Sequence, residues 1–286
     1  MPVFGTQNFG SGATSAYEIE KSCIFNGTDA YMSRTPGSAG NQKTMTQSMW
    51  VKRGKVTTDQ AVGINTAEGL GLWLNANDTM TWYCHYDSGW EGKLTTTKTF
   101  RDPAAWYHIV TMVDTTQAVA ANRAKIYVNG TQISDLSLSD YPDQNDDTAF
   151  NAAAAHSIGI WLSTPSYYYN GYIAEMHWID GTALTPSSFG ETNDEGVWVP
   201  KKYSGSYGTT GFYLDFADSS DLGDDESGQG NDWAESNLAA SDQRTDTPTN
   251  NQVTFNPLNN QQSGADAITE GNTVYNGPST RTMISL

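Results

Sequence analysis

The chain has 286 residues, a length that fits one β domain with extensions or two smaller domains. It carries 32 acidic and 15 basic residues and a formal charge of −17, so nucleic acids and anionic membranes would repel it. Aromatic residues make up 12% of the chain, which predicts a folded core. No apolar run is long enough for a membrane-spanning helix, and no signal peptide is recognisable. We therefore expect Cys23 and Cys84 to be free, buried thiols.

Residues 1–16 are rich in Gly, Ser and Thr with scattered Phe, and they predict an extended N-terminal arm. From residue 17 to about 190, short alternating segments recur with turn residues between them, as β-strands do. The predicted strands are 22–25, 30–33, 45–52, 69–74, 79–86, 106–113, 125–128, 157–162 and 171–179.

Two turn signals predict hairpins. Residues 75–78 (NAND) join two predicted strands, and Asn129-Gly130 directly follows the β-branched run at 125–128. Helical periodicity is nearly absent, and only 152–155 and 186–189 are compatible with a single turn. Short strands without helices bury their faces only by sheet-on-sheet packing, so the fold class is all-β, an antiparallel β-sandwich.

The composition of the chain changes at residue 214 from alternating strand segments to acidic and then polar residues. The window 215–246 contains ten acidic residues and one basic residue, Arg244, and residues 250–286 are rich in Asn, Thr, Gln and Ser. The predicted organisation is therefore an arm at 1–16, a sandwich at 17–213, and an acidic then polar segment at 214–286 that is irregular, and extended or packed on a neighbour.

Three stretches resemble the concanavalin A-like lectin/glucanase superfamily in its laminin-G-like branch. They are IFNGTDAYMS at 24–33, WYHIV at 106–110 with KIYVNG at 125–130, and NGYIAEM at 170–176 with DGTALTP at 180–186. The resemblance covers about residues 20–190 and implies a concanavalin A-like jelly roll.

A narrower similarity is to virion proteins of tailed bacteriophages. It rests on SRTP at 33–36, SAGNQKT at 38–44, WVKRG at 50–54, YLDF at 213–216 and SGQGNDW at 227–233. This resemblance implies a tail-fibre or other structural protein, assembled in the host cytoplasm and exposed on the phage particle. We expect the chain to form a homo-oligomer, a trimer, and to contact other virion proteins through its N-terminal arm and its polar C-terminal segment. Longer relatives carry a second β domain, so this chain is either a short form or an N-terminal part.

Glucanases of this superfamily use two glutamates flanking an aspartate on one strand. The nearest match is 175–180, where strand alternation puts Glu175 and His177 on one face and Asp180 on the other. The second carboxylate is missing, so we predict no catalytic residues. The four histidines are single residues on predicted strands, and no His or Cys pair has zinc-finger spacing.

An oxygen-rich loop predicts calcium binding. Asp225, Ser227, Gln229, Asn231 and Asp232 offer oxygen ligands around glycines, and laminin-G-like domains often bind calcium at the sandwich rim. The loop is similar to an EF-hand with Gly230 at the turn, although position twelve is Ser236 and not Glu. The alternative is an Asx-turn loop whose carboxylates cap their own backbone.

Two aromatic segments are candidates for sugar binding, because aromatic faces stack on pyranose rings beside polar groups. The predicted ligand-binding residues are Tyr86, Asp87 and Trp90 in one segment and Tyr167, Tyr168 and Tyr169 in the other. Three consecutive tyrosines on a strand point to both faces, so at least one is expected to be exposed. The alternative is that these residues form a subunit interface or plain packing.

These observations predict a non-enzymatic virion structural protein, a tail-fibre or capsid-surface decoration component, whose lectin-like jelly roll contacts host glycans or stabilises the particle. Avidity of an oligomer would multiply weak glycan contacts. One alternative is a polysaccharide depolymerase of the glucanase type, and another is a capsid-stabilising protein without a ligand.

Overall fold

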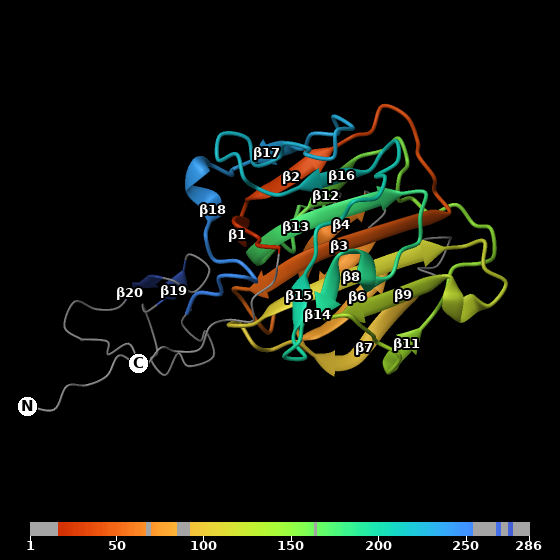
Figure 1. Ribbon diagram of the computed structural model, residues 1–286, viewed down its shortest axis with the longest axis horizontal. Coiled ribbons are helices and arrows are strands. Elements are labelled where there is room, and N and C mark those ends of the chain that lie inside the picture. The colour runs from red at the N-terminus through yellow and green to blue at the C-terminus, as the bar shows by residue number, and fades with distance from the viewer. Residues whose placement is uncertain are drawn as a thin grey trace, which may run out of the picture.

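In the computed structural model, two eight-stranded antiparallel sheets stack face to face (Figure 1). The structure describes residues 17–66, 70–84, 92–162, 165–253, 267–269 and 274–276. Sheet A has the order β10-β9-β8-β3-β13-β1-β18 with β16 beside β13, and sheet B has the order β11-β7-β6-β5-β4-β12-β2-β17. The all-β sandwich predicted from the strand pattern is confirmed. In the described part of the chain, no helix is long and apolar enough to span a membrane.

The strands of sheet A are β1 (Ser22–Asn26), β3 (Thr44–Arg53), β8 (Trp106–Asp114), β9 (Ala124–Val128), β10 (Thr131–Gln132), β13 (Asn170–Asp180), β16 (Phe212–Leu214) and β18 (Gln243–Arg244). Those of sheet B are β2 (Tyr31–Arg34), β4 (Gln60–Thr66), β5 (Gly71–Leu74), β6 (Thr79–Tyr83), β7 (Lys93–Thr99), β11 (Leu136–Ser139), β12 (His156–Ile158) and β17 (Ala234–Ser236). Two short hairpins are β14 (Gly190–Thr192) with β15 (Trp198–Pro200), and β19 (Ala267–Thr269) with β20 (Val274–Asn276). The 3-10 helices are Ala120–Asn122, Pro186–Ser188 and Ala240–Asp242.

The main core lies between the two sheets and follows the alternation of the strands. In β6, Met80 and Trp82 are buried against it, whereas Tyr83, on the alternate face, is half-buried. Phe25 of β1 and Ile173 of β13 reach the same core from sheet A. Cys23 and Cys84 also belong to it, and both are free and buried, as the sequence predicts.

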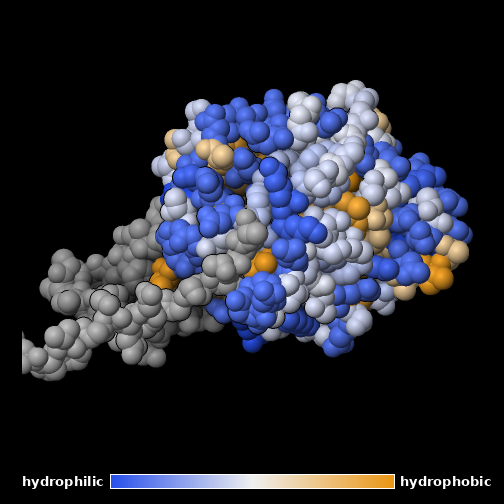
Figure 2. Space-filling model, viewed as in Figure 1, coloured by the Kyte–Doolittle hydropathy of each residue, from blue (hydrophilic) through white to orange (hydrophobic). Residues whose placement is uncertain are grey.

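The outer face of sheet A is covered as well. The β14–β15 hairpin and the segment 245–252, which we call the strap, lie on it, and Figure 1 shows β14 and β15 in front of sheet A. Every residue of β3 and β13 except the first is therefore buried. Figure 2 shows mostly hydrophilic side chains on the face that these segments create. The outer face of sheet B stays open along β7 and β11.

Both predicted hairpins form. Asn75–Asp78 joins β5 to β6, and Asn129-Gly130 joins β9 to β10 with φ values of 47° and 78°, as a type I′ turn requires. Residues 152–155 form no helical turn, whereas a 3-10 helix begins at Pro186.

The segment from residue 214 onward contributes β17 to sheet B and β18 to sheet A of the same chain. Two short pieces of the acidic window 215–246 therefore pair with the sheets of the same chain.

Candidate functional site

Four aromatic side chains gather on the outer face of sheet B, and we call them the aromatic platform. Trp73 lies at the centre, with ring centroids 5.0 Å from Tyr167, 5.7 Å from Trp161 and 6.0 Å from Tyr83. The Tyr167 side chain is the most open of the four, since the residue is 42% exposed. The platform thus places a partly exposed tyrosine beside a buried indole.

Local geometry holds Tyr167 over Trp73. Tyr167 adopts the left-handed conformation with φ of 58°, which a residue other than glycine rarely does without a structural reason. Its carbonyl accepts a hydrogen bond of 2.8 Å from Ala61 N of β4, and Ala61 pairs with Trp73 in β5. The turn that carries Tyr167 is therefore tied to the strands beneath the platform.

A groove of about 530 Å³ continues from the platform across β6, β7 and β11. Its lining includes Asn75, Thr79, Thr81, Lys93, Thr95 and Leu138. Asn75 Nδ2 donates to the hydroxyls of Thr79 and Thr81 at 2.8 Å, and the hydroxyls of Thr81 and Thr95 lie 3.0 Å apart. Lys93 Nζ lies 5.0 Å from the centroid of the Tyr83 ring, which joins the groove to the platform.

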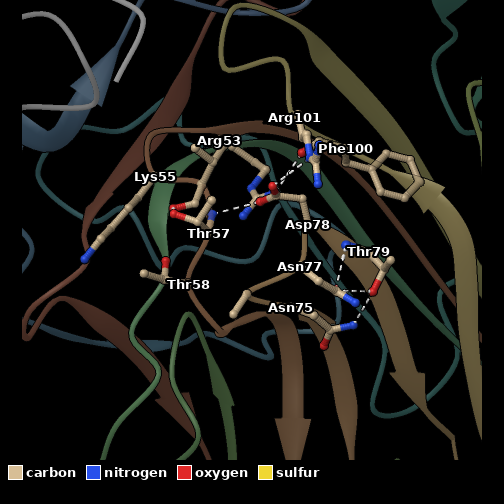
Figure 3. Close-up of polar contacts among 12 residues, drawn as sticks. Arg53, Lys55, Thr57, Thr58, Asn75, Asn77, Asp78, Thr79, Phe100 and Arg101 are labelled. Carbon is tan, nitrogen blue, oxygen red and sulfur yellow. Dashed lines mark hydrogen bonds and ion pairs between the residues drawn. The ribbon is translucent and has the colours of Figure 1, made fainter. Parts of the chain in front are cut away.

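A buried carboxylate fixes the turn at the end of the groove (Figure 3). Asp78 Oδ1 accepts from Arg53 Nη1 at 3.0 Å and from Thr57 N at 2.8 Å, and Asp78 Oδ2 accepts from Arg101 Nε at 3.0 Å. Arg53 is fully buried, and its Nη1 also donates to the carbonyl of Phe100. This network holds the turn 75–78, so Asn75 keeps its orientation toward the groove threonines.

The predicted tyrosines separate in the structure. Tyr167 is exposed, as expected for at least one of the three, and belongs to the platform. Tyr168 is half-buried, with its ring 6.5 Å from that of Tyr31. Tyr169 is fully buried, and its hydroxyl donates to the carbonyl of Lys52 at 2.9 Å. This burial corrects the expectation that Tyr169 contacts a ligand. Tyr86, Asp87 and Trp90 lie outside the described residues.

The platform also contains residues that the sequence analysis missed. The sequence analysis places Trp73, Tyr83 and Trp161 on strands and predicts no binding role for them. Alternation along β5 and β6 was the available signal, because it places Trp73 and Tyr83 opposite the core-facing Leu72 and Trp82. The approach of Trp161 and Tyr167 depends on contacts distant in sequence, which no local pattern reports.

The carboxylates nearest to a glucanase motif are structural. Glu175 lies in a bulge of β13 with φ of 49°, and its Oε1 accepts from the hydroxyls of Tyr17 and Tyr213. His177 Nε2 lies 3.2 Å from its Oε2. Burial alone would raise the pKa of Glu175, but hydrogen bonds and charge interaction with these partners outweigh burial and lower it.

Asp180 is also buried and accepts from the backbone N–H groups of Asn41 and Thr210. Neither Glu175 nor Asp180 lines the sheet B groove, where Asp59 is the one carboxylate among the described lining residues. Asp59 Oδ1 itself accepts from Ala76 N at 2.7 Å.

In the acidic loop, Asp225 Oδ1 accepts from the backbone N–H groups of Tyr213 and Ser227, and its Oδ2 accepts from Asn231 N and the Ser227 hydroxyl. Asp232 Oδ1 accepts from Asp225 N at 3.2 Å. Asn231 Oδ1 bonds to Arg34, and Gln229 N donates to the Ser227 hydroxyl.

These contacts match the Asx-turn alternative, in which carboxylates cap backbone. Within the described ranges, no group of three or more His, Cys, Asp or Glu side chains converges as a metal site. Calcium binding by this loop stays a prediction.

Comparison with known proteins identifies a family by sequence. Residues 26–188 match the laminin-G-like model described as the concanavalin A-like lectin/glucanases superfamily. A candidate carbohydrate-binding protein from Bacteroides ovatus has a similar structure, with 16% identity and a TM-score of 0.51 over 80% of this chain and 60% of that protein. The matched region thus spans less than two thirds of that protein.

Two further solved structures show lower similarity. A pentraxin from Limulus polyphemus shows 13% identity and a TM-score of 0.44 over 65% of this chain and 94% of its own. Domains LG4-5 of the mouse laminin α1 chain show 11% identity and a TM-score of 0.40 over 68% of this chain and 48% of that one. No curated protein matches the sequence. Since the family model spans more than half of the chain, the protein belongs to the concanavalin A-like lectin/glucanases superfamily.

Proposed function

We propose that this chain is a non-enzymatic carbohydrate-binding protein that uses the aromatic platform and the adjoining groove on sheet B. The observation that carries the proposal is the exposed Tyr167 ring beside Trp73, next to a groove lined by hydroxyl and amide groups. Aromatic faces supply apolar contact area, and a few placed polar groups supply orientation, as ligand sites in general require.

The arrangement of carboxylates supports binding without cleavage. Glycoside hydrolysis uses two carboxyl groups roughly 5–9.5 Å apart across the scissile bond. The described groove offers Asp59 alone, and that carboxylate accepts a backbone hydrogen bond. Glu175 and Asp180 are held in buried hydrogen-bond networks elsewhere. A depolymerase is therefore the second candidate.

The biological setting that we propose is the tailed-phage particle, where the chain acts as a tail-fibre or capsid-surface component. The support is the resemblance of segments such as SRTP at 33–36 and SGQGNDW at 227–233 to phage virion proteins. In a homotrimer attached to other virion proteins, several platforms would engage one host surface, and avidity would raise weak affinities. The alternative in this setting is a protein that stabilises the particle and binds no glycan through the platform.

A glycan array combined with a reducing-end assay tests the proposal. We expect the protein to bind a defined group of glycans while releasing no reducing ends from the same polysaccharides. Sustained release of reducing ends would establish the depolymerase instead. Absence of binding to host-surface polysaccharide and to the whole array would contradict carbohydrate recognition and favour a purely stabilising role.

A further inference from the structure

A second groove lies on the opposite side of the molecule, on the outer face of sheet A. Its volume is about 760 Å³, within the range of about 300–1,000 Å³ typical of ligand sites. β15 forms one wall, the strap forms another, and the side chains of Trp50, Trp106 and Trp198 line it. We call it the tryptophan groove. It shares no lining residue with the groove on sheet B.

Two glycines, Gly130 and Gly190, leave space for the Trp198 side chain. A Cβ atom on Gly130 would lie 2.5 Å from Cε3 of the indole, and a Cβ atom on Gly190 would lie 2.5 Å from its Cζ2. The indole therefore sits in a slot between the β9–β10 turn and β14, which only glycines leave open. Its Nε1 donates to His108 Nδ1 at 3.0 Å, and the His108 ring stacks between Trp198 and Trp50.

The other wall is equally well defined. Trp106 Nε1 donates to Asp246 Oδ1 at 3.1 Å, and Lys52 Nζ lies 2.8 Å from Asp246 Oδ2. Lys52 also donates to the Asn251 side chain and to the Gln252 carbonyl, which fixes the strap. Because both charges are buried and paired with each other, the groove presents no net charge from this cluster. The N–H groups of Trp106 and Trp198 are bonded within the protein. Trp50 and Trp106 are only 5% and 8% exposed, so the half-buried Trp198 offers most of the indole carbon surface to a ligand.

Two exposed side chains add polar groups to this surface. Asn129 Oδ1 accepts from His108 N, and Asn250 Nδ2 donates to the Thr245 carbonyl. The remaining amide atoms, the donor Asn129 Nδ2 and the acceptor Asn250 Oδ1, have no hydrogen-bond partner among the described residues. The groove thus combines indole surface with an unused donor and an unused acceptor on opposite sides.

We propose that the tryptophan groove is a second binding site and that its ligand is an uncharged oligosaccharide segment. Indole surface suits the C–H faces of pyranose rings, the free amide atoms suit hydroxyls, and the internally neutralised Lys52–Asp246 pair gives no attraction for a charged ligand. The proposal goes beyond the platform on sheet B, because the two sites lie on different sheets and make the chain bivalent.

Calorimetric titration with cellohexaose, maltohexaose and isomaltohexaose tests this site, with hexagalacturonate as the charged comparison. Intrinsic tryptophan fluorescence gives a second readout. We expect at least one neutral hexasaccharide to bind and to change the tryptophan emission. Trp198→Ala should weaken that binding at least tenfold, since loss of one aromatic contact of about 1.4 kcal/mol is a factor of ten. Asn129→Asp keeps the Oδ1 acceptor for His108 N and a residue type that tolerates the φ of 47°, but it removes the Nδ2 donor, so it should weaken binding with little effect on folding.

Tyr167→Ala serves as the matched control, because it alters the platform and leaves the tryptophan groove intact. Binding that depends on Trp198 and Asn129 but not on Tyr167 supports the second site, whatever the platform does. Binding that depends only on Tyr167 overturns the second site and leaves the proposed function standing. Failure of all neutral probes, equal binding of hexagalacturonate through Trp198, or self-association that buries Trp198 would also overturn it.

Discussion

Lys52 Nζ lies 2.8 Å from Asp246 Oδ2, and these two side chains are 0% and 3% exposed. The pair joins the middle of sheet A to a strap that is 194 residues away in sequence. Asp246 Oδ1 simultaneously accepts from Trp106 Nε1 and from Gln252 N. One carboxylate therefore positions the strap and one wall of the tryptophan groove.

Lys52→Met should reduce the free energy of unfolding by about 3–5 kcal/mol, because it leaves the buried Asp246 carboxylate without its cation. Urea unfolding measures this loss. Lys43→Met is the matched control, since Lys43 and Asp147 are 3.7 Å apart with side chains 40% and 64% exposed. Its cost should stay within about 1 kcal/mol. Equal losses in the two variants would contradict the structural role of the buried pair.

Asp78→Asn should be destabilising by a similar amount, roughly 3–5 kcal/mol, because Arg53 would stay buried without a counter-charge. The Arg101 side chain is 60% exposed, so Arg101→Ala should cost less than about 1 kcal/mol although it contacts the same carboxylate. Chemical denaturation of the three proteins distinguishes the two contacts. If Arg101→Ala were the more damaging change, the network would not depend on Arg53.

Gly130→Ala and Gly196→Ala separate backbone strain from steric exclusion. Both glycines have positive φ, 78° and 79°, so either alanine should cost about 1–2 kcal/mol in backbone strain. An added Cβ at Gly196 meets no atom within 4 Å, whereas at Gly130 it collides with Trp198. Gly130→Ala should therefore lose about a further 1–3 kcal/mol and shift the tryptophan emission. Identical thermal unfolding of both variants would show that the slot does not constrain Trp198.

Burial, followed by the nearby His177, lowers the pKa of His108 to about 3. The unfolded chain, with an ordinary pKa near 6.5, binds the proton first as the pH falls. The stability contributed by neutral His108 is therefore complete above about pH 6.5 and is lost progressively toward pH 3.

The wild-type free energy of unfolding should fall by roughly 2–3 kcal/mol between pH 6.5 and 4.5 because of this residue. His108→Gln should lack that part of the decline, and urea unfolding at several pH values measures it. A pH dependence that the substitution leaves unchanged would refute the assignment.

Much of the fold was predictable because strand alternation and turn chemistry are local. The type I′ turn at Asn129-Gly130 and the core-facing positions of β6 follow from residue type and spacing. The pairing of β17 and β18 with the sheets was harder to predict from the sequence. These strands are three and two residues long, and their acidic surroundings indicate solvent rather than a sheet edge. Pairing over such distances is specified by tertiary contacts such as Lys52–Asp246.

The candidate site was predictable only in part, for a related reason. The run of three tyrosines predicts Tyr167 as a ligand-binding residue. The same run also predicts Tyr169, which is buried in the core. What distinguishes them is the left-handed backbone at Tyr167, which turns its ring onto Trp73. The tryptophan groove depends on three indoles from β3, β8 and β15, and no local pattern brings these together.

The measurement that tests the central claim most directly is a calorimetric titration of a glycan selected from the array against wild-type protein, Tyr167→Ala and Tyr168→Ala. Tyr167 is open on the platform, whereas its neighbour Tyr168 packs beside Tyr31. We predict that Tyr167→Ala weakens binding about tenfold while Tyr168→Ala binds as the wild type does. Unchanged affinity in Tyr167→Ala, with both variants folded, would contradict carbohydrate recognition by the platform.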